Sequence, residues 1–124
     1  MTQTKPDMIA IVDDDDAARH ALQFLLNVLG RRPESFASAA AFLASEVEKF
    51  ACLILDQHMP AMTGLELAQR LRSEQNRIPI MLISGDLTAD VVDKAAKVGI
   101  DLVSEKPPEL NALSRFIDSA VQQG

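Results

Sequence analysis

The stretch Ala51-Cys52-Leu53-Ile54-Leu55-Asp56 decides the fold class, because five apolar residues run without interruption into a carboxylate. A strand that is buried on both faces has this composition, and helices bury both faces of a parallel sheet. Two similar short apolar runs occur at Met8–Val12 and at Ile80–Ser84. The sequence therefore predicts a parallel sheet that buries these three segments.

Two weaker strands are expected at Pro33–Ala37 and Asp101–Ser104. Pro33 cannot donate a hydrogen bond to a neighbouring strand, and polar Glu34 follows it, so the first of the two suits an edge of the sheet. Apolar residues at helical spacing fill the intervals between the strands. We expect helices over residues 18–29, 39–47, 65–71, 91–98 and 110–120.

Helix-capping residues lie at the ends of these intervals. Ser38 and Thr88 are placed to cap the second and fourth helices, and Gly99 is placed to end the fourth. Five alternating strand and helix units predict an α/β fold, most economically a flavodoxin-like (βα)5 three-layer sandwich with a parallel sheet in the order 2-1-3-4-5.

Length and composition fit one globular unit. The chain has 124 residues, 48% of them hydrophobic and 24% charged, and a mean hydropathy of +0.06. We expect a single domain over residues 1–124 with an ordered core at about 8–121. No apolar run approaches the roughly 20 residues that cross a bilayer, and Met1–Asp7 lacks the pattern of a secretory signal. A cytoplasmic location is expected.

Charge and cysteine content exclude other classes. A net charge of −6 argues against direct nucleic acid binding by this chain, because the phosphate backbone dominates such affinity. Cys52 is the only cysteine, so an intrachain disulfide is impossible, and its apolar neighbours indicate a buried structural thiol.

Polar side chains end or follow four of the predicted strands: Asp13-Asp14, Asp56, Ser84 and Lys106. In open α/β sheets ligands bind beyond the carboxyl ends of the strands, so these side chains are expected to meet. Gathered carboxylates need a cation, and oxygen ligands favour Mg²⁺. Asp56 is the natural nucleophile toward phosphorus, with Mg²⁺ and Lys106 neutralising the transferred group.

Each residue also has a purely structural interpretation. The run Asp13–Asp16 could be a solvated acidic start of a helix, and Asp15 and Asp16 are expected to keep that role as cap and first-turn residues. No second His or Cys lies at ligand spacing from His58, so its ring is expected in a loop and not on a metal. His20 is expected to face solvent.

The strand-end motifs together resemble the receiver domain of bacterial response regulators, over about residues 8–121. The matching segments are Ile11-Val12-Asp13-Asp14, Leu55 to Gly64, Ser84-Gly85 and Lys106-Pro107. The segment from Phe36 to Leu43 is similar to receivers of the nitrogen-fixation regulator type, which usually precede a helix-turn-helix output domain.

The resemblance implies a two-component phosphorylation switch and not an enzyme with a separate substrate. Asp56 would accept a phosphoryl group from the phosphohistidine of a histidine kinase or phosphotransfer protein, and would promote its own phosphorylation and dephosphorylation. Mg²⁺ would be held by Asp13, Asp14, Asp56 and the backbone carbonyl of His58. Lys106 and the hydroxyl of Ser84 would contact the phosphoryl group.

The resemblance also implies a cis Lys106-Pro107 bond and a conformational change of the face formed by the fourth helix, fifth strand and fifth helix. A downstream output protein or domain would be the partner of that face, and a phosphorylation-dependent homodimer is compatible with it. No membrane partner is expected.

Two positions depart from the family pattern. Val103 stands where receivers commonly have Tyr or Phe, so the usual aromatic switch is missing, and Pro108 stands where an apolar aromatic is common. We expect Ser84 and its loop to move on phosphorylation and backbone rearrangement to carry the signal.

Alternative functions remain at this point. A cofactor-binding flavodoxin-like protein or a small phosphate-binding enzyme is disfavoured, because Asp13–Asp16 would repel a phosphate and neither Tyr nor Trp is present. A degenerate receiver that only docks proteins is a further alternative. The chain could also be part of a larger DNA-binding regulator or a hybrid kinase.

Overall fold

The computed structural model describes residues 6–123 and shows one five-stranded sheet. The strands are β1 (Met8–Val12), β2 (Arg32–Phe36), β3 (Phe50–Asp56), β4 (Ile80–Ser84) and β5 (Leu102–Glu105). All pairings are parallel, in the order β2-β1-β3-β4-β5. The predicted flavodoxin-like topology is confirmed. Residues 1–5 and 124, the ends of the predicted single domain and most of the Met1–Asp7 segment, lie outside the described residues.

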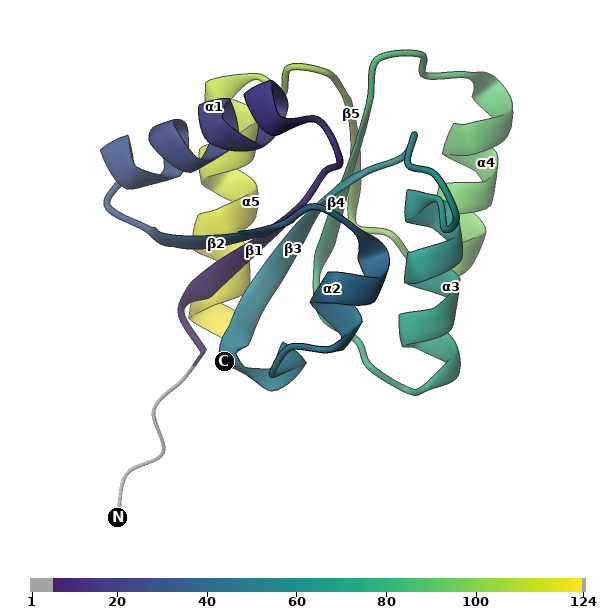
Figure 1. The fold of residues 1–124 in the computed structure, drawn as a ribbon, viewed down its shortest axis with the longest axis horizontal. Coiled ribbons are helices and arrows are strands. Elements are labelled where there is room, and N and C mark those ends of the chain that lie inside the picture. The colour runs from purple at the N-terminus through teal and green to yellow at the C-terminus, as the bar shows by residue number, and fades with distance from the viewer. Residues whose placement is uncertain (1–5, 124) are drawn as a thin grey trace.

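Helices form the two outer layers. They are α1 (Asp16–Val28), α2 (Ala39–Leu43), α3 (Gly64–Ser73), α4 (Ala89–Val98) and α5 (Leu110–Gln123). In Figure 1, α1 and α5 lie on one face of the sheet, and α2, α3 and α4 lie on the other. None of the helices described between residues 6 and 123 is long and apolar enough to span a bilayer.

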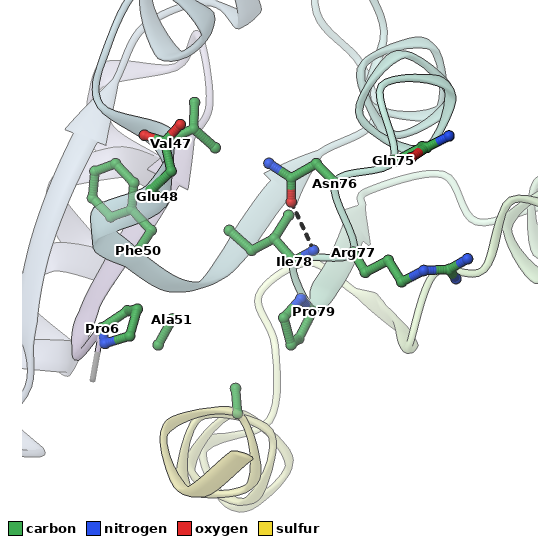
Figure 2. Close-up of a pocket in the computed structure, with 11 residues that line it drawn as sticks. Pro6, Val47, Glu48, Phe50, Ala51, Gln75, Asn76, Arg77, Ile78 and Pro79 are labelled. Carbon is green, nitrogen blue, oxygen red and sulfur yellow. Dashed lines mark hydrogen bonds between the residues drawn. The ribbon is translucent and has the colours of Figure 1, made fainter. Parts of the chain in front are cut away.

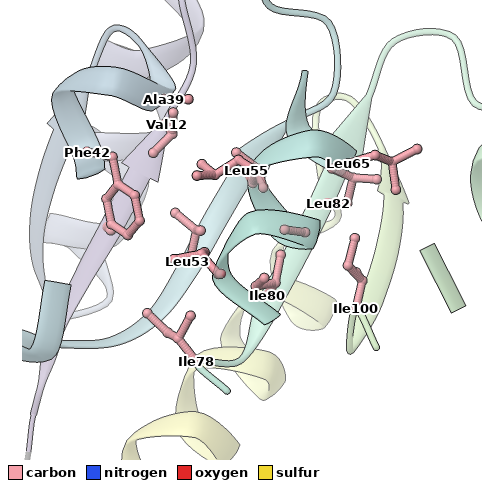
Figure 3. Packing of buried hydrophobic residues seen from close by; sticks show 14 of the residues in the cluster. Val12, Ala39, Phe42, Leu53, Leu55, Leu65, Ile78, Ile80, Leu82 and Ile100 are labelled. Carbon is pink, nitrogen blue, oxygen red and sulfur yellow. The ribbon is translucent and has the colours of Figure 1, made fainter. Parts of the chain in front are cut away.

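Alternation along the strands divides the core in two. Leu53 and Leu55 of β3 belong to the cluster under α2, α3 and α4, which Figure 3 shows together with Phe42 and Leu82. Cys52 on the other face packs under α1 and α5. Burial raises the pKa of the Cys52 thiol to about 12, so the predicted role as a structural thiol agrees with its surroundings.

The caps explain where most helices begin. The side chains of Ser38 and Thr88 accept hydrogen bonds from Ala41 N and Val91 N. Thr63 forms a reciprocal capping box with Glu66 at the start of α3. Gly99 ends α4 with a φ of 84°, a left-handed conformation that suits glycine.

The second helix is shorter than predicted. It ends at Leu43, and Val47 lies instead in a separate 3₁₀ turn, η1 (Val47–Lys49). The hydroxyl of Ser45 donates to the carbonyl of Phe42, and this local bond competes with continuation of the helix.

Three strand boundaries also differ from the predictions. β2 spans Arg32–Phe36 and β3 spans Phe50–Asp56, while Asp101 precedes β5. The Asp101 side chain accepts a hydrogen bond from Ile80 N, so it serves the start of β4. The position of β2 at an edge, expected from Pro33, is confirmed.

Candidate functional site

Strand register brings the predicted site residues to one edge of the sheet, which we name the carboxyl edge because the strands end there. Val12 is paired with Leu55, and Asp56 is paired with Ile83. Ser84 is paired with Glu105. The residues that follow β1 and β5, Asp13 and Lys106, therefore leave the sheet beside Asp56 and Ser84.

Three carboxylates meet at this edge. Asp13, Asp14 and Asp56 each offer an oxygen, and these oxygens all lie within 4.8 Å of one another. Asp13 and Asp56 are buried, whereas Asp14 is exposed. Lys106 Nζ lies 2.8 Å from Asp13 Oδ2 and 3.5 Å from Asp56 Oδ1. One ammonium group thus contacts two buried acids.

The charges perturb one another. Burial raises the pKa of Asp56 from an ordinary 3.8 to about 6, and the charge of Asp13 adds to the rise while Lys106 opposes it. Burial by itself lowers the pKa of Lys106, but contact with Asp13 and then Asp56 outweighs it, so the net shift is upward. The three carboxylates lie close together, and the single positive charge of Lys106 does not neutralise all of them.

The donor set fits a hard divalent cation. Asp13 Oδ2 is buried and, among the described residues, accepts no well-directed hydrogen bond, so its 2.8 Å contact with Lys106 is a charge contact. A buried carboxylate oxygen without a hydrogen bond is costly unless something compensates it. Carboxylate oxygens are the ligands that Mg²⁺ prefers. The acidic cluster of Asp13, Asp14 and Asp56 is therefore the candidate cation site.

Ser84 and Lys106 are held by the loops around them. Ser84 is buried, and its Oγ accepts a hydrogen bond from Asp86 N at 3.1 Å. Its carbonyl accepts from Lys106 N at 3.0 Å. The Lys106-Pro107 bond is cis, as the resemblance implied.

The loop after Asp56 folds tightly against the strand end. Gln57 N donates to Ile83 O, and the buried Gln57 side chain accepts from Leu65 N in the first turn of α3. A Cβ at Gly64 would lie 2.6 Å from Asp56 O, so only glycine allows this approach. The ring of His58 is exposed, as expected for a loop residue, and its backbone N–H helps to lower the pKa of Asp56.

Within the run Asp13–Asp16, the last two residues serve the start of α1, as expected from helix capping. Asp15 caps α1 by accepting from Ala17 N, and Asp16 lies in the first turn. His20 is exposed. Sequence reasoning missed Arg19, whose guanidinium donates to the backbone carbonyl of Asp13 at 2.8 Å. Spacing along α1 could have indicated its ion pair with Asp16, but not a bond to a carbonyl.

Cavities are also present away from these residues. One of about 450 Å³ opens at the opposite edge of the sheet, between the starts of β3 and β4, where Figure 2 shows Phe50 and Pro79 among its lining residues. The candidate site is recognised by its charged groups.

Comparison with known proteins agrees with this geometry. Residues 9–118 match the family model of the response regulator receiver domain. The chain belongs to that family. Members of this family are phosphoacceptor switches of two-component signal transduction, and Mg²⁺ and phosphoaspartate are standard for the receiver domain.

Curated relatives place the receiver within longer proteins. The chain is 36% identical to the transcriptional regulatory protein FixJ of Bradyrhizobium diazoefficiens over 93% of its length and 57% of FixJ. It is 44% identical to the response regulator protein TmoT of Ectopseudomonas mendocina, covering 94% of this chain and 55% of TmoT. The receiver chain thus spans little more than half the length of these relatives.

Solved structures agree in fold. The receiver is similar to the crystal structure of FixJ-N, with 30% identity, a TM-score of 0.84, and coverage of 99% of this chain and 98% of that one. The response regulator StyR gives 36% identity and a TM-score of 0.82 over 97% of this chain and 61% of StyR. The predicted similarity to receivers of the nitrogen-fixation regulator type is confirmed.

Proposed function

We propose that Asp56 accepts a phosphoryl group from a phosphohistidine on a histidine kinase or phosphotransfer protein, in a reaction that requires Mg²⁺. The observation that carries this proposal is the convergence of Asp13, Asp14 and Lys106 on the buried carboxylate of Asp56. A carboxylate can form an acyl phosphate by nucleophilic attack. Lys106 supplies positive charge directly, and Asp13 and Asp14 would supply it through the cation that they hold, as phosphoryl transfer needs.

The transfer exchanges one bond for another. A carboxylate oxygen of Asp56 attacks the phosphorus, the new O–P bond forms, and the N–P bond of the donor histidine breaks, with its electron pair returning to the imidazole. Lys106, already 3.5 Å from Asp56 Oδ1, places an ammonium beside the oxygens that gain negative charge. The hydroxyl of Ser84 is the further group that would contact the bound phosphoryl.

Asp13, Asp14 and Asp56 would hold the Mg²⁺ ion through carboxylate oxygens, with the backbone carbonyl of His58 as a further ligand. When bound, Mg²⁺ supplies positive charge that neutralises both the acidic cluster and the phosphoryl oxygens. Asp13 Oδ2, which accepts no directed hydrogen bond from the described residues and lies 2.8 Å from Lys106 Nζ, would be one of these oxygens.

Movement of Ser84 would be the first step in transmitting the signal from the phosphorylated site. Its Oγ now accepts from Asp86 N, so turning toward a phosphoryl group on Asp56 would disturb the loop that leads to α4. Val103 in β5 is a half-buried aliphatic residue packed against the core, and so cannot supply an aromatic switch. The signal at the face of α4, β5 and α5 would therefore pass through backbone rearrangement.

The partner of that face would be an output protein or domain. Relatives about twice as long include the transcriptional regulatory proteins FixJ and TdiR, which supports a role for this receiver within a larger DNA-binding regulator. The net charge of −6 supports assigning any nucleic acid binding to another module.

The test is incubation with acetyl phosphate, with and without Mg²⁺, followed by intact mass measurement. We expect a Mg²⁺-dependent gain of one phosphoryl group that disappears in Asp56→Asn. Asp118→Asn, a change to an exposed acid on α5, is the matched control and should be phosphorylated normally. Failure of the unmodified protein to gain mass would favour a degenerate receiver that only docks proteins.

A further inference from the structure

Arg19 of α1 holds the backbone of the acidic loop. Its side chain is only 13% exposed, and Nη1 donates to the carbonyl of Asp13 at 2.8 Å. Its Nη2 forms an ion pair with Asp16. The rigid guanidinium fork thus joins the first turn of α1 to the end of β1.

Hydrogen bonds hold three of the four polar groups of Asp13, which are its backbone N–H, its carbonyl and Oδ1. Asp13 N donates to Phe36 O at 3.1 Å, and Asp13 Oδ1 accepts from Asp15 N at 2.9 Å. With the carbonyl held by Arg19, Oδ2 is left without a directed hydrogen bond from residues 6–123, and it lies on the side of Lys106. The contacts together fix where this oxygen lies.

The hydrogen bond from Arg19 to the Asp13 carbonyl also affects Asp14, the next acid in the chain. The carbonyl of Asp13 and the N–H of Asp14 belong to one planar peptide unit, so a bond that fixes the carbonyl fixes the orientation of the whole unit. That unit connects the two acids of the cation site. The direction in which Asp14 leaves the strand therefore depends on Arg19.

We infer that Arg19 is a positioning residue for the cation site, which orients the peptide between Asp13 and Asp14 so that both carboxylates face Asp56. The inference rests on the proposed function for the identity of the cation as Mg²⁺. Residues that orient metal ligands without touching the metal typically change affinity by about 10- to 100-fold when they are replaced.

Positioning and simple electrostatics predict opposite results. Arg19 is a cation near an acidic cluster, so its charge repels a second cation, and removal of the charge alone would strengthen Mg²⁺ binding. Loss of the oriented peptide would weaken Mg²⁺ binding. The sign of the change in affinity therefore separates the two roles.

The experiment follows MgCl₂ titrations by amide NMR in the unmodified protein and in Arg19→Met, which keeps a long apolar stem without the donors. We expect Mg²⁺ binding to weaken by about tenfold in Arg19→Met. Arg31→Met is the matched control, because Arg31 also forms an ion pair with an aspartate, Asp118, but lies beyond the other end of α1. The Mg²⁺ affinity of Arg31→Met should stay within about twofold of that of the unmodified protein, because the change removes only an exposed ion pair.

A second measurement reads the peptide directly. The residual dipolar coupling of the Asp14 N–H reports the orientation of the peptide unit in the metal-free protein, and it should change in Arg19→Met but not in Arg31→Met. Arg19→Lys replaces Arg19→Met if the latter does not fold, and should change both readouts in the same direction by a smaller amount.

Unchanged or tighter Mg²⁺ binding, or an unchanged Asp14 coupling, would overturn the inference. If the unmodified protein bound no Mg²⁺, the proposed function would fail, and the Asp14 coupling would still decide whether Arg19 orients the peptide.

Discussion

At both edges of the sheet, an arginine side chain donates hydrogen bonds to backbone carbonyls. The two edges differ in whether the polar groups around the arginine have hydrogen-bond partners. At the amino edge, where the strands begin, Arg72 donates to the carbonyls of Asn76 at 3.0 Å, Ile78 at 2.9 Å and Gly99 at 2.9 Å. Asp101 lies 3.7 Å from the same guanidinium and accepts a hydrogen bond from Ile80 N. The three carbonyls and the Asp101 carboxylate in this network therefore each have a partner.

The carboxyl edge is not balanced in this way. Asp13 Oδ2 is buried without a directed hydrogen bond in the described chain, and the pKa of Asp56 is raised to about 6. One edge therefore ties α3, α4 and the sheet together, while the other keeps unfavourable negative charge that a cation would relieve. Substitutions at the two edges should change stability in opposite directions.

The largest effect is expected from Arg72→Met at the amino edge. Three carbonyls would lose a charged donor, and bonds to charged groups each contribute about 1.5–3 kcal/mol, partly replaced by water here. We expect the free energy of unfolding to fall by about 3 kcal/mol in urea titrations.

Arg70→Met is the control for that change. Arg70 lies on the same helix but is exposed and pairs with Glu74 one turn along the helix, so its loss should change stability by less than about 0.5 kcal/mol. Equal effects of the two substitutions would contradict the role given to Arg72.

Asp56→Asn at the carboxyl edge should stabilise the metal-free protein. Its carboxyl pKa is raised from 3.8 to about 6, so at pH 7 the folded chain carries an ionised group that burial disfavours. With about 1.4 kcal/mol for each pKa unit, removal of that charge should raise the free energy of unfolding by about 2–3 kcal/mol, measured by urea titration with a chelator present.

The same shift predicts a pH dependence. The folded chain keeps the Asp56 proton to a higher pH than the unfolded chain does, so the contribution of this group to stability is fully present below about pH 4. It falls as the pH rises to about 6. The stability difference between Asp56→Asn and the unmodified protein should therefore grow between pH 4 and pH 6, and a constant difference would contradict the shifted pKa.

Mg²⁺ should stabilise the folded chain by a smaller amount. At a concentration ten times the dissociation constant, binding to the folded state alone adds about 1.4 kcal/mol to the free energy of unfolding. Thermal unfolding with and without MgCl₂ measures this, and a chelator should reverse it. Asp13→Asn should remove most of this stabilisation. If divalent salts in general still stabilised that variant, the binding would be non-specific.

The smallest effect is expected at the surface. Arg31 and Asp118 form an ion pair in which Asp118 is 53% exposed, so solvent screens the attraction. Asp118→Asn should change the midpoint of urea unfolding by an amount equivalent to less than about 0.5 kcal/mol. A larger loss would mean that this pair anchors the turn between α1 and β2 to α5.

Much of the site followed from the sequence because strand-end residues can be identified from local patterns. Apolar runs ending in Asp13, Asp56 and Ser84 predicted a shared edge, and the register places these residues there. The second helix was predicted too long, because the hydrogen bond of Ser45 to Phe42 competes locally with the helical pattern.

The sequence by itself determined the alternation of strands and helices, the caps and the set of polar residues at the strand ends, since each depends on side chains close together in the chain. Only the tertiary structure decided that Asp13 Oδ2 is buried beside Lys106, that Arg19 holds the carbonyl of Asp13 and that Arg72 joins two loops. Those contacts depend on distances between segments far apart in the chain and on backbone carbonyls, which every residue possesses and no sequence pattern distinguishes.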